Sequence, residues 1–389
     1  MRLDVLVFGG GAAGLWCLDR LRRAGYHAIL LESKAIGSGQ TIQAQGIIHG
    51  GGKYALRGVR DFDAVRATSA MPERWRQCLA GAIEPDLSAA RLLSTVCHLW
   101  LPRGLFMARL QALGFMSFVA NAGLLATRPI KVAVDAWPEA LRADALAVYS
   151  LAEPVIATGS VLKALAMRYA KFIFLYDATA LAFSRDGVRV GDVLLQPRAK
   201  VFAAGAGNGE LLTKAGKNAD LMQCRPLGMV LMRGAFPPLF GHCIVGGKTG
   251  LTITTPSSGV WQIGGEIAEQ LANEPSPAAA RTKAFAEIRR WLPRVDFAGA
   301  EIALYRAVRA EARTAASRRP SGVHANRIAP GVIVAWPTKL SMVPVLADEV
   351  FELLRGDLKE PDGADETPPW PAPTVARYPW EEAEWFAVS

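Results

Sequence analysis

Apolar residues at the start of the chain form a short uninterrupted run, Leu3–Phe8, which ends at a group of glycines. A continuous run of this length is typical of a strand buried on both faces in a parallel sheet. In Ala12–Arg23, leucines recur every three residues and arginines gather at the end, which predicts an amphipathic helix. A second apolar run, His27–Leu31, then leads into Glu32. The succession predicts a β-α-β unit with two parallel strands.

Three glycines follow the first predicted strand with the spacing Gly9-x-Gly11-x-x-Gly14. The first allows a tight turn, the second lets backbone approach a pyrophosphate, and the third lets the helix pack closely on the strand. The helix N-terminus offers N–H groups to the phosphates, and Glu32 suits the ribose hydroxyls. Residues 199–212 lack a third glycine at this spacing. The chain therefore predicts one dinucleotide site, which the motif alone does not assign to NAD or FAD.

A glycine-rich loop, QAQGIIHGGGKYAL, covers residues 43–56 and contains His49. Glycine lets a backbone come close to a neighbour, so we expect the loop to run against a bound cofactor. Histidine has a pKa near neutrality and is the natural base for a hydroxyl proton. Two readings of His49 stay open: a base or substrate contact, and a structural contact that braces the loop.

Charge and cysteine content narrow the function classes. The net charge is +9, although residues 357–389 contain eight acidic and two basic side chains. The rest of the chain, which we call the body, is therefore basic, and a basic body suits an anionic cofactor, substrate or lipid surface. No block of interleaved basic and aromatic residues occurs, which argues against nucleic acid. Five cysteines without C-x-x-C spacing argue against a zinc site and a disulfide framework, and we expect no metal.

The chain also lacks the marks of export or membrane insertion. Its start does not resemble a signal peptide, and it has no run of about 18 apolar residues. Its cysteine usage is typical of a reducing compartment. We therefore expect a cytoplasmic protein, with peripheral contact at the inner face of a membrane as the alternative.

These features resemble, in their order along the chain, the FAD-dependent oxidoreductases of the D-amino-acid oxidase superfamily. The nearest branch is that of glycerol-3-phosphate dehydrogenase and L-2-hydroxyglutarate oxidase. The segment TIQAQGIIHGGGKY is similar to that branch's Ile-His-(Gly/Ala)-Gly-x-x-Tyr loop, with His49, Gly51 and Tyr54 at matching positions. Residues 172–183 match the family's adenine strand, and residues 201–212 match its second flavin motif. Residues 225–232 and 260–266 match the two substrate-domain strands, and residues 330–354 match the final strand, loop and helix.

Three departures from the family pattern concern the substrate more than the cofactor. Members commonly carry Ser or Thr and Arg/Lys-Asn where this chain has Thr41, Gln43 and Ala44. The usual Gly-Gly-x-Gly before the final helix is replaced by the residues WPTK at 336–339. Ala310 replaces the proline that usually follows the arginine gripping the substrate, here Arg309.

The resemblance implies an α/β fold with a discontinuous, Rossmann-like FAD-binding domain and a mainly antiparallel β-sheet substrate domain. The FAD-binding domain would take residues 1–85, 146–215 and 326–357, and the substrate domain 86–145 and 216–325. The tail, 358–389, is acidic and rich in Pro and Trp, a linker by composition. Its aromatic residues nevertheless predict that it packs on the basic body, with a homodimer contact as the alternative use.

The resemblance also implies the site residues. Arg309, Lys339, Lys53 and Lys248 are candidates for holding an anionic group, and Lys339 is also a candidate for stabilising reduced flavin. A covalent bond from His49 to the flavin 8-methyl carbon is a further possibility for that residue. The implied catalytic residues are His49, Arg309 and Lys339. The implied FAD-binding residues are Gly9, Gly11, Ala12, Ala13, Gly14, Glu32, Ser33, Lys34, Gln40, Thr41, Gln45, Gly46, Ile47, Ala180, Ala204, Gly205, Thr338, Lys339, Leu340 and Ser341.

Members of the superfamily move a hydride from a C–H next to nitrogen or oxygen to flavin N5. An alcohol needs a base, so the favoured function is oxidation of a small anionic CH–OH substrate, a hydroxy acid or polyol phosphate. An amine can react as its free base, which makes amino-acid or amine oxidation the alternative. A flavoprotein subunit without turnover is a third reading. The electron acceptor stays open between oxygen, a quinone and a partner protein.

Overall fold

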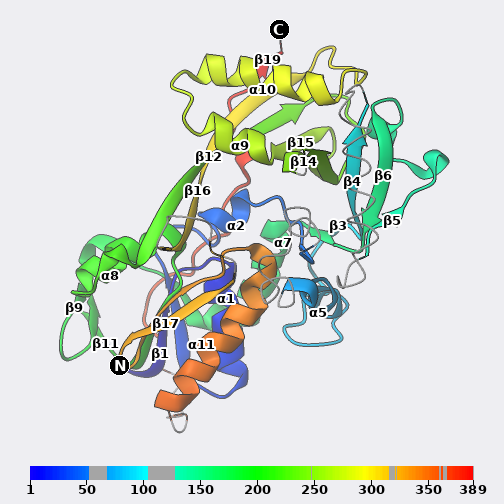
Figure 1. Ribbon diagram of the computed structural model, residues 1–389. Helices are drawn as coiled ribbons and strands as arrows, with labels where there is room; N and C mark the ends of the chain where they lie inside the picture. Colours follow the sequence, from blue (N-terminus) through cyan, green and yellow to red (C-terminus); the bar gives the residue numbers. More distant parts are fainter. Residues whose placement is uncertain are drawn as a thin grey trace.

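Two β-sheets organise the chain into two lobes, one above the other in Figure 1. The structure, a computed structural model, describes residues 1–51, 68–103, 128–246, 248–314, 320, 322–358, 361 and 366–388. Lys53 and Tyr54 lie outside these residues. Within them, no helix is both long and apolar enough to cross a membrane. The architecture is the expected one, a Rossmann-like lobe with a mainly antiparallel second lobe.

The lower lobe is built on an eight-stranded sheet whose centre is the predicted β-α-β unit. Strand β1 (Arg2–Phe8) pairs in parallel with β2 (Ala28–Glu32) and, on its other side, with β11 (Val193–Phe202). The remaining strands of this sheet are β8 (Ile173–Leu175), β9 (Leu181–Phe183), β10 (Val188–Val190), β17 (His324–Ala329) and β18 (Val332–Trp336).

Strand β1 is buried on both faces, as its unbroken apolar run predicts. Val5 and Val7 belong to a core shared with the lobe's helices. Leu6 and Phe8 point to the opposite face, where the β9–β10 hairpin covers them. The helices on the first face are α1 (Ala12–Arg23), α5 (Met71–Leu79), α7 (Thr158–Arg168) and α11 (Val343–Asp357).

The upper lobe contains a nine-stranded sheet in which all pairs are antiparallel except β13 with β4. Helices α9 (Glu266–Leu271) and α10 (Pro277–Trp291) pack on one face of this sheet (Figure 1). Its strands are β4 (Cys97–Pro102), β5 (Ile130–Lys131), β6 (Ala145–Leu151), β12 (Met222–Arg233), β13 (Gly241–Val245), β14 (Lys248–Ser257), β15 (Val260–Gly264), β16 (Glu301–Ala312) and β19 (Phe386–Ala387).

Two details differ from the sequence expectations. The expected boundary at residue 146 falls inside β6, which pairs with β4 along its length and so belongs to the upper sheet. Residues 172–183 form two strands, β8 and β9, rather than one, because a turn at Ala178–Ala180 separates them.

Outside both sheets, β3 (Leu92–Ser94) pairs with β7 (Val155–Ile156). The short helices α2 (Gln40–Gln43) and α8 (Asn208–Lys214) lie near the boundary of the two lobes.

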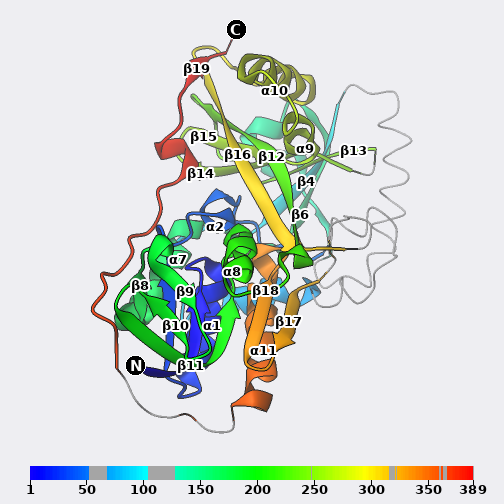
Figure 2. The ribbon, with the colours of Figure 1, turned by 90° about the vertical axis from the view of Figure 1, so that its left-hand side faces the viewer.

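The C-terminal tail runs along the side of both lobes, as Figure 2 shows in red. On the lower lobe, Trp370 packs edge-on against Phe174, with ring centroids 6.5 Å apart. On the upper lobe, strand β19 pairs with β16, and the Arg281 guanidinium lies 3.6 Å from the centre of the Phe386 ring. Packing of the aromatic tail on the basic body is therefore confirmed.

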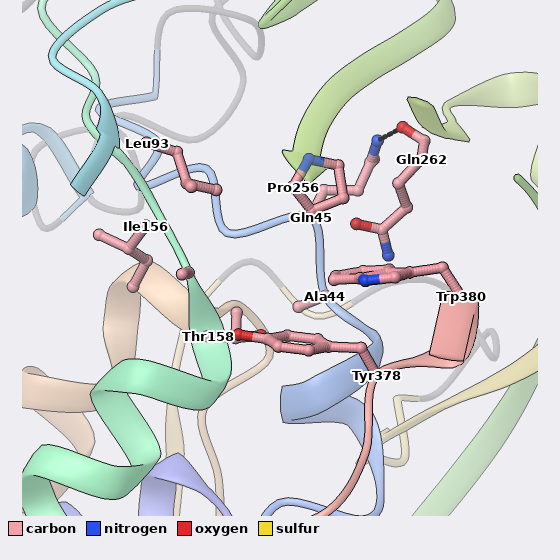
Figure 3. Close-up of a pocket in the computed structure, with 10 residues that line it drawn as sticks. Ala44, Gln45, Leu93, Ile156, Thr158, Pro256, Gln262, Tyr378 and Trp380 are labelled. Atoms are coloured by element: carbon pink, nitrogen blue, oxygen red, sulfur yellow. Dashed lines mark hydrogen bonds between the residues drawn. The ribbon is translucent and has the colours of Figure 1, made fainter. Parts of the chain in front are cut away.

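Between these two ends, a stacked aromatic pair holds the tail at the lobe boundary. The rings of Tyr378 and Trp380 are 4.2 Å apart and nearly parallel, and Figure 3 shows them beside Ala44 and Gln262. The Tyr378 hydroxyl accepts a hydrogen bond of 2.8 Å from the backbone N–H of Gly159, at the start of α7. The tail thus lies beside Ala44, in the glycine-rich loop that carries His49 (Figure 3).

Candidate active site

A cavity of about 740 Å³ lies between the lobes, at the carboxyl ends of β1, β2, β11 and β18. Open parallel sheets bind ligands at this edge, and the volume is that of a large ligand site. Nearly all predicted site residues line it: Gly9, Gly11, Ala12, Ala13, Glu32, Ser33, Lys34, Gln40, Thr41, Gln45, Gly46, Ile47, His49, Ala204, Gly205, Arg309, Thr338, Lys339 and Leu340. Gly14, Ala180 and Ser341 do not line it, and the individual roles toward FAD stay predictions.

The three fingerprint glycines differ in what a side chain would meet. A Cβ on Gly9 would lie 2.5 Å from the Ala204 backbone, and Gly9 has a φ of +104°. A Cβ on Gly14 would lie 1.9 Å from the carbonyl oxygen of Gly9, so this glycine serves helix packing. A Cβ on Gly11 would meet only the Thr41 hydroxyl, at 3.4 Å, and would otherwise enter the cavity. The space beside Gly11 fits a pyrophosphate.

Glu32 is nearly buried at the end of β2, where its carboxylate is held by two backbone groups. It accepts hydrogen bonds from the N–H groups of Gly10, at 2.6 Å, and Lys34, at 2.8 Å. A carboxylate has about four acceptor positions, so Glu32 can also accept from ribose hydroxyls. Burial and the Glu32 charge raise the pKa of the neighbouring Tyr176 to about 12, which keeps that phenol protonated at neutral pH. The residues present therefore fit the adenosine half of FAD.

The second flavin motif is held in place by Asn208, a buried residue that the sequence pattern did not single out. Its Oδ1 accepts a hydrogen bond of 2.8 Å from the Ala204 N–H. Its Nδ2 donates to the carbonyl oxygens of Phe202, at 3.1 Å, and Ala335, at 3.4 Å. These bonds tie the ends of β11 and β18 together beneath the cavity.

Replacing Asn208 by alanine should lower the free energy of unfolding by about 1–3 kcal/mol, because it leaves buried backbone groups without their partner. Chemical denaturation monitored by circular dichroism measures this change. An unchanged midpoint and slope would contradict the tethering role.

The loop before α11 replaces the family's glycines with a strained threonine. Thr338 has a φ of 62°, the only positive φ of a non-glycine residue in the described parts of the chain. Its hydroxyl donates a hydrogen bond of 2.6 Å to the carbonyl oxygen of Gly322, which helps to hold this conformation. The Trp336 indole donates to the carbonyl oxygen of Gly205, at 3.2 Å, and so joins this loop to the second flavin motif.

Three arginines of the upper sheet line the cavity, but they differ in their ionic partners. Arg225 makes a two-point contact, 2.6 and 3.2 Å, with the buried carboxylate of Glu311. The predicted Arg309 lies 3.4 Å from Glu269. Arg306 is exposed, and its side chain contacts no ionic or hydrogen-bonding group among the residues that the structure describes.

The structure therefore changes which cationic side chains are candidates for holding an anionic group. Lys248 pairs with Glu266 at 2.8 Å and does not line the cavity, which removes it from the candidates. Arg306 was missed because the sequence R-A-V-R offers two arginines three residues apart, and only their surroundings distinguish them. Arg306 is the cation of this strand best able to receive an anion.

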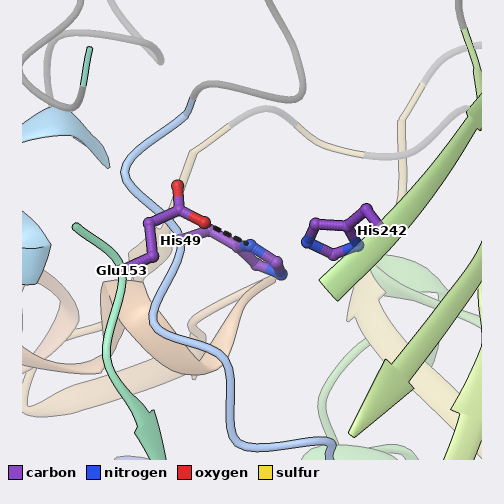
Figure 4. Close-up of side chains that lie close together, drawn as sticks. All are labelled: His49, Glu153 and His242. Carbon is purple, nitrogen blue, oxygen red and sulfur yellow. Dashed lines mark ion pairs between the residues drawn. The ribbon is translucent and has the colours of Figure 1, made fainter. Parts of the chain in front are cut away.

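His49 lines the cavity and lies against two buried residues that sequence reasoning did not connect with it (Figure 4). Its Nδ1 is 3.5 Å from Oε2 of Glu153, which is 1% exposed. The ring of His242 lies 5.4 Å from that of His49, and its Nδ1 is 2.8 Å from the Thr252 hydroxyl. The three side chains come from distant parts of the chain, so no local sequence signal could have grouped them.

The loop around His49 shows a different use of glycine from the expected one. Gly46 has a φ of +73°, and a Cβ there would lie 2.0 Å from the carbonyl oxygen of Ile156. The Ile156 N–H donates to the Gly46 carbonyl oxygen at 3.0 Å, and Ile48 N–H donates to that of Pro154 at 2.9 Å. The close approach at Gly46 is thus to the β7 backbone, and this pairing presents His49 to the cavity.

Comparisons with known proteins agree with this geometry. Residues 4–350 match the family model described as DAO, FAD dependent oxidoreductase. The probable FAD-dependent oxidoreductase PA4991 of Pseudomonas aeruginosa is 36% identical over 391 residues, which cover 98% of each sequence. Its crystal structure superposes with a TM-score of 0.82 at 32% identity, again covering 98% of both chains.

More distant structures share the fold alone. The glycine oxidase of Geobacillus kaustophilus has a TM-score of 0.66 at 16% identity, over 93% of this chain and 97% of the other. The L-α-glycerophosphate oxidase of Mycoplasma pneumoniae, solved with FAD bound, has a TM-score of 0.66 at 14% identity, over 91% and 95%. The cavity, the fingerprint and the family match lead to one conclusion: the chain belongs to the DAO family of FAD-dependent oxidoreductases, and its cofactor is FAD.

Proposed function

We propose that this oxidoreductase acts on a small anionic CH–OH substrate, a hydroxy acid or polyol phosphate, as in the glycerol-3-phosphate dehydrogenase and L-2-hydroxyglutarate oxidase branch. When bound, FAD accepts a hydride from the substrate carbon. The residues of the chain must then position that carbon, hold the anionic group and receive the hydroxyl proton.

The observation that carries the proposal is the pairing of His49 with the buried Glu153 at the cavity wall. A carboxylate behind an imidazole orients the ring and stabilises its protonated form. His49 can therefore take the hydroxyl proton while the hydride leaves the carbon. An amine that reacts as its free base would not require this pair, so its presence favours an alcohol.

The anionic character of the substrate is supported by Arg306. Arg306 is among the cavity-lining residues of β16, and its side chain faces no ionic partner in the described parts of the chain. A guanidinium can hold a carboxylate or phosphate with two parallel hydrogen bonds. Oxidation of an amino acid is the second candidate, because the fold likeness to glycine oxidase is as high as that to glycerophosphate oxidase.

Matched probes test the requirement for an anion. The oxygen-free holoenzyme is mixed with glycerol 3-phosphate or glycerol, and with 2-hydroxy acids or their amides, while the visible flavin absorbance is followed. The charged member of a pair should bleach the flavin, and Arg306→Met should raise the concentration needed by about 10- to 100-fold, the value of a charged hydrogen-bonded pair. Arg225→Met is less suitable as a control, because it would leave the buried carboxylate of Glu311 without its ion-pair partner.

Equal bleaching by charged and uncharged members would contradict the proposed role of an anionic group. If Arg306→Met needs the same concentration of the charged compound as wild type, and Arg309→Met needs a higher one, the anion-binding role would belong to Arg309, the arginine predicted from the sequence.

A further inference from the structure

Three metal-ligating side chains converge at the edge of the cavity. His49 comes from the loop after α2, Glu153 from the connection of β6 to β7, and His242 from β13. One ligand atom from each lies within 4.8 Å of the other two. Glu153 and His242 are buried, at 1% and 0% exposure. Nothing in the FAD chemistry proposed above requires His242 in this group.

We propose that His49, Glu153 and His242 form a binding site for a divalent transition-metal ion of the Zn²⁺ type. Two imidazoles and one carboxylate are a common ligand set for zinc with an open fourth position. The 3.5 Å between His49 Nδ1 and Glu153 Oε2 exceeds a usual hydrogen-bond distance. It is close to the roughly 3.4 Å that separates two ligands on one tetrahedral ion with bonds of about 2.0–2.1 Å.

The hydrogen-bonding partners of His242 and Glu153 support the assignment. Metal-binding histidines usually bond a neighbour through the other ring nitrogen, which fixes the ring and its tautomer. The Nδ1 of His242 is 2.8 Å from the Thr252 hydroxyl, and Figure 4 shows the far ring nitrogen directed toward His49. On the opposite side, the Gly50 N–H donates a hydrogen bond of 2.6 Å to Oε1 of Glu153 and leaves Oε2 on the side of His49.

The position of the site also provides access and charge balance. The His49 side chain is 15% exposed and lines the cavity, so an ion can enter from there and keep one position open to the cavity. The negative charge of Glu153 offsets part of the charge of a divalent cation in this buried setting. Two nitrogen ligands select against Mg²⁺, which prefers an octahedral set of oxygens.

Binding has a functional consequence that rests on the proposed function. An imidazole that donates its lone pair to a metal cannot take a proton with the same nitrogen, and its other nitrogen then carries hydrogen. The ion would compete with the substrate proton for His49. We therefore expect Zn²⁺ to inhibit flavin reduction by an alcohol.

Equilibrium dialysis of the holoenzyme against Zn²⁺, followed by metal analysis, tests the site itself. Wild type should retain one Zn²⁺ per chain and should not retain Mg²⁺. His242→Asn and Glu153→Gln should each weaken Zn²⁺ binding by at least tenfold. Thr252→Val keeps all three ligands and should weaken it by about 10- to 100-fold. The matched control is His98→Asn, in neighbouring strand β4, which should bind as wild type does.

X-ray absorption at the zinc edge should show only nitrogen and oxygen ligands, at about 2.0–2.1 Å, with histidine scattering and no sulfur. FAD content and circular dichroism confirm that each variant is folded. Failure of wild type to retain Zn²⁺, retention by His242→Asn as tight as by wild type, or sulfur ligation would overturn the site. Stoichiometric binding that leaves flavin reduction unchanged supports the site and overturns only the role of His49 as base.

Discussion

Replacing His49 by glutamine lowers the rate constant of flavin reduction by about 10²- to 10⁴-fold, the usual contribution of a general base. Glutamine keeps a hydrogen-bonding group at the cavity wall but cannot take up the hydroxyl proton at neutral pH. FAD content should be unchanged, because His49 lies beyond the fingerprint glycines and Glu32 that fit the adenosine half. Anaerobic stopped-flow absorbance measures the rate constant under single-turnover conditions.

His98→Asn is the matched control, since it replaces another partly buried histidine, on strand β4 of the upper lobe, that does not line the cavity. It should reduce its flavin at the wild-type rate. A wild-type rate in His49→Gln would leave His49 a structural role only. Loss of bound FAD in that variant would instead indicate that the residue holds the cofactor.

Alanine at Gly14 and at Gly11 should affect different properties of the protein. The Gly14→Ala methyl group would lie 1.9 Å from the Gly9 carbonyl oxygen, so helix α1 must move away from the turn. Such overpacking costs about 1–3 kcal/mol or more, and the free energy of unfolding should fall even without FAD. The Gly11→Ala methyl group has room beside Thr41 but enters the space that fits the pyrophosphate.

Gly11→Ala should therefore keep its fold and lose at least tenfold in FAD affinity. Thermal unfolding of the FAD-depleted protein and titration with FAD measure the two effects separately. Equal stability of the two depleted variants, or an unchanged FAD affinity in Gly11→Ala, would contradict the division of roles between these glycines.

The N-terminal lobe could be predicted from the sequence because its signals are local. The run from β1 through α1 to Glu32 keeps strand, turn and helix chemistry in one stretch, and helix α1 has the predicted bounds Ala12–Arg23. The boundary near residue 146 could not be predicted, since β6 belongs to the upper sheet only through its pairing with β4. Partner strands distant in sequence leave no local periodicity that identifies them.

The candidate catalytic group shows the same limit more sharply. His49 stood out because glycines surround it, whereas Glu153 and His242 have ordinary neighbours in the sequence. The fold brings them together only after β7 pairs with the loop at Gly46 and β13 joins β4. Arg306 could not be predicted for another reason. It differs from Arg225 and Arg309 in having no carboxylate partner in the described parts of the chain, and ion pairs cannot be read from the sequence.

The central claim, that this FAD enzyme oxidises an anionic alcohol, is tested most directly by pairs of compounds that differ only in the reacting group. The oxygen-free wild-type holoenzyme is mixed with each 2-hydroxy acid and with the 2-amino acid of the same carbon skeleton, and with polyol phosphates. We predict that at least one hydroxy compound bleaches the visible flavin absorbance while its amino counterpart does not. Bleaching by amino compounds alone would contradict the claim.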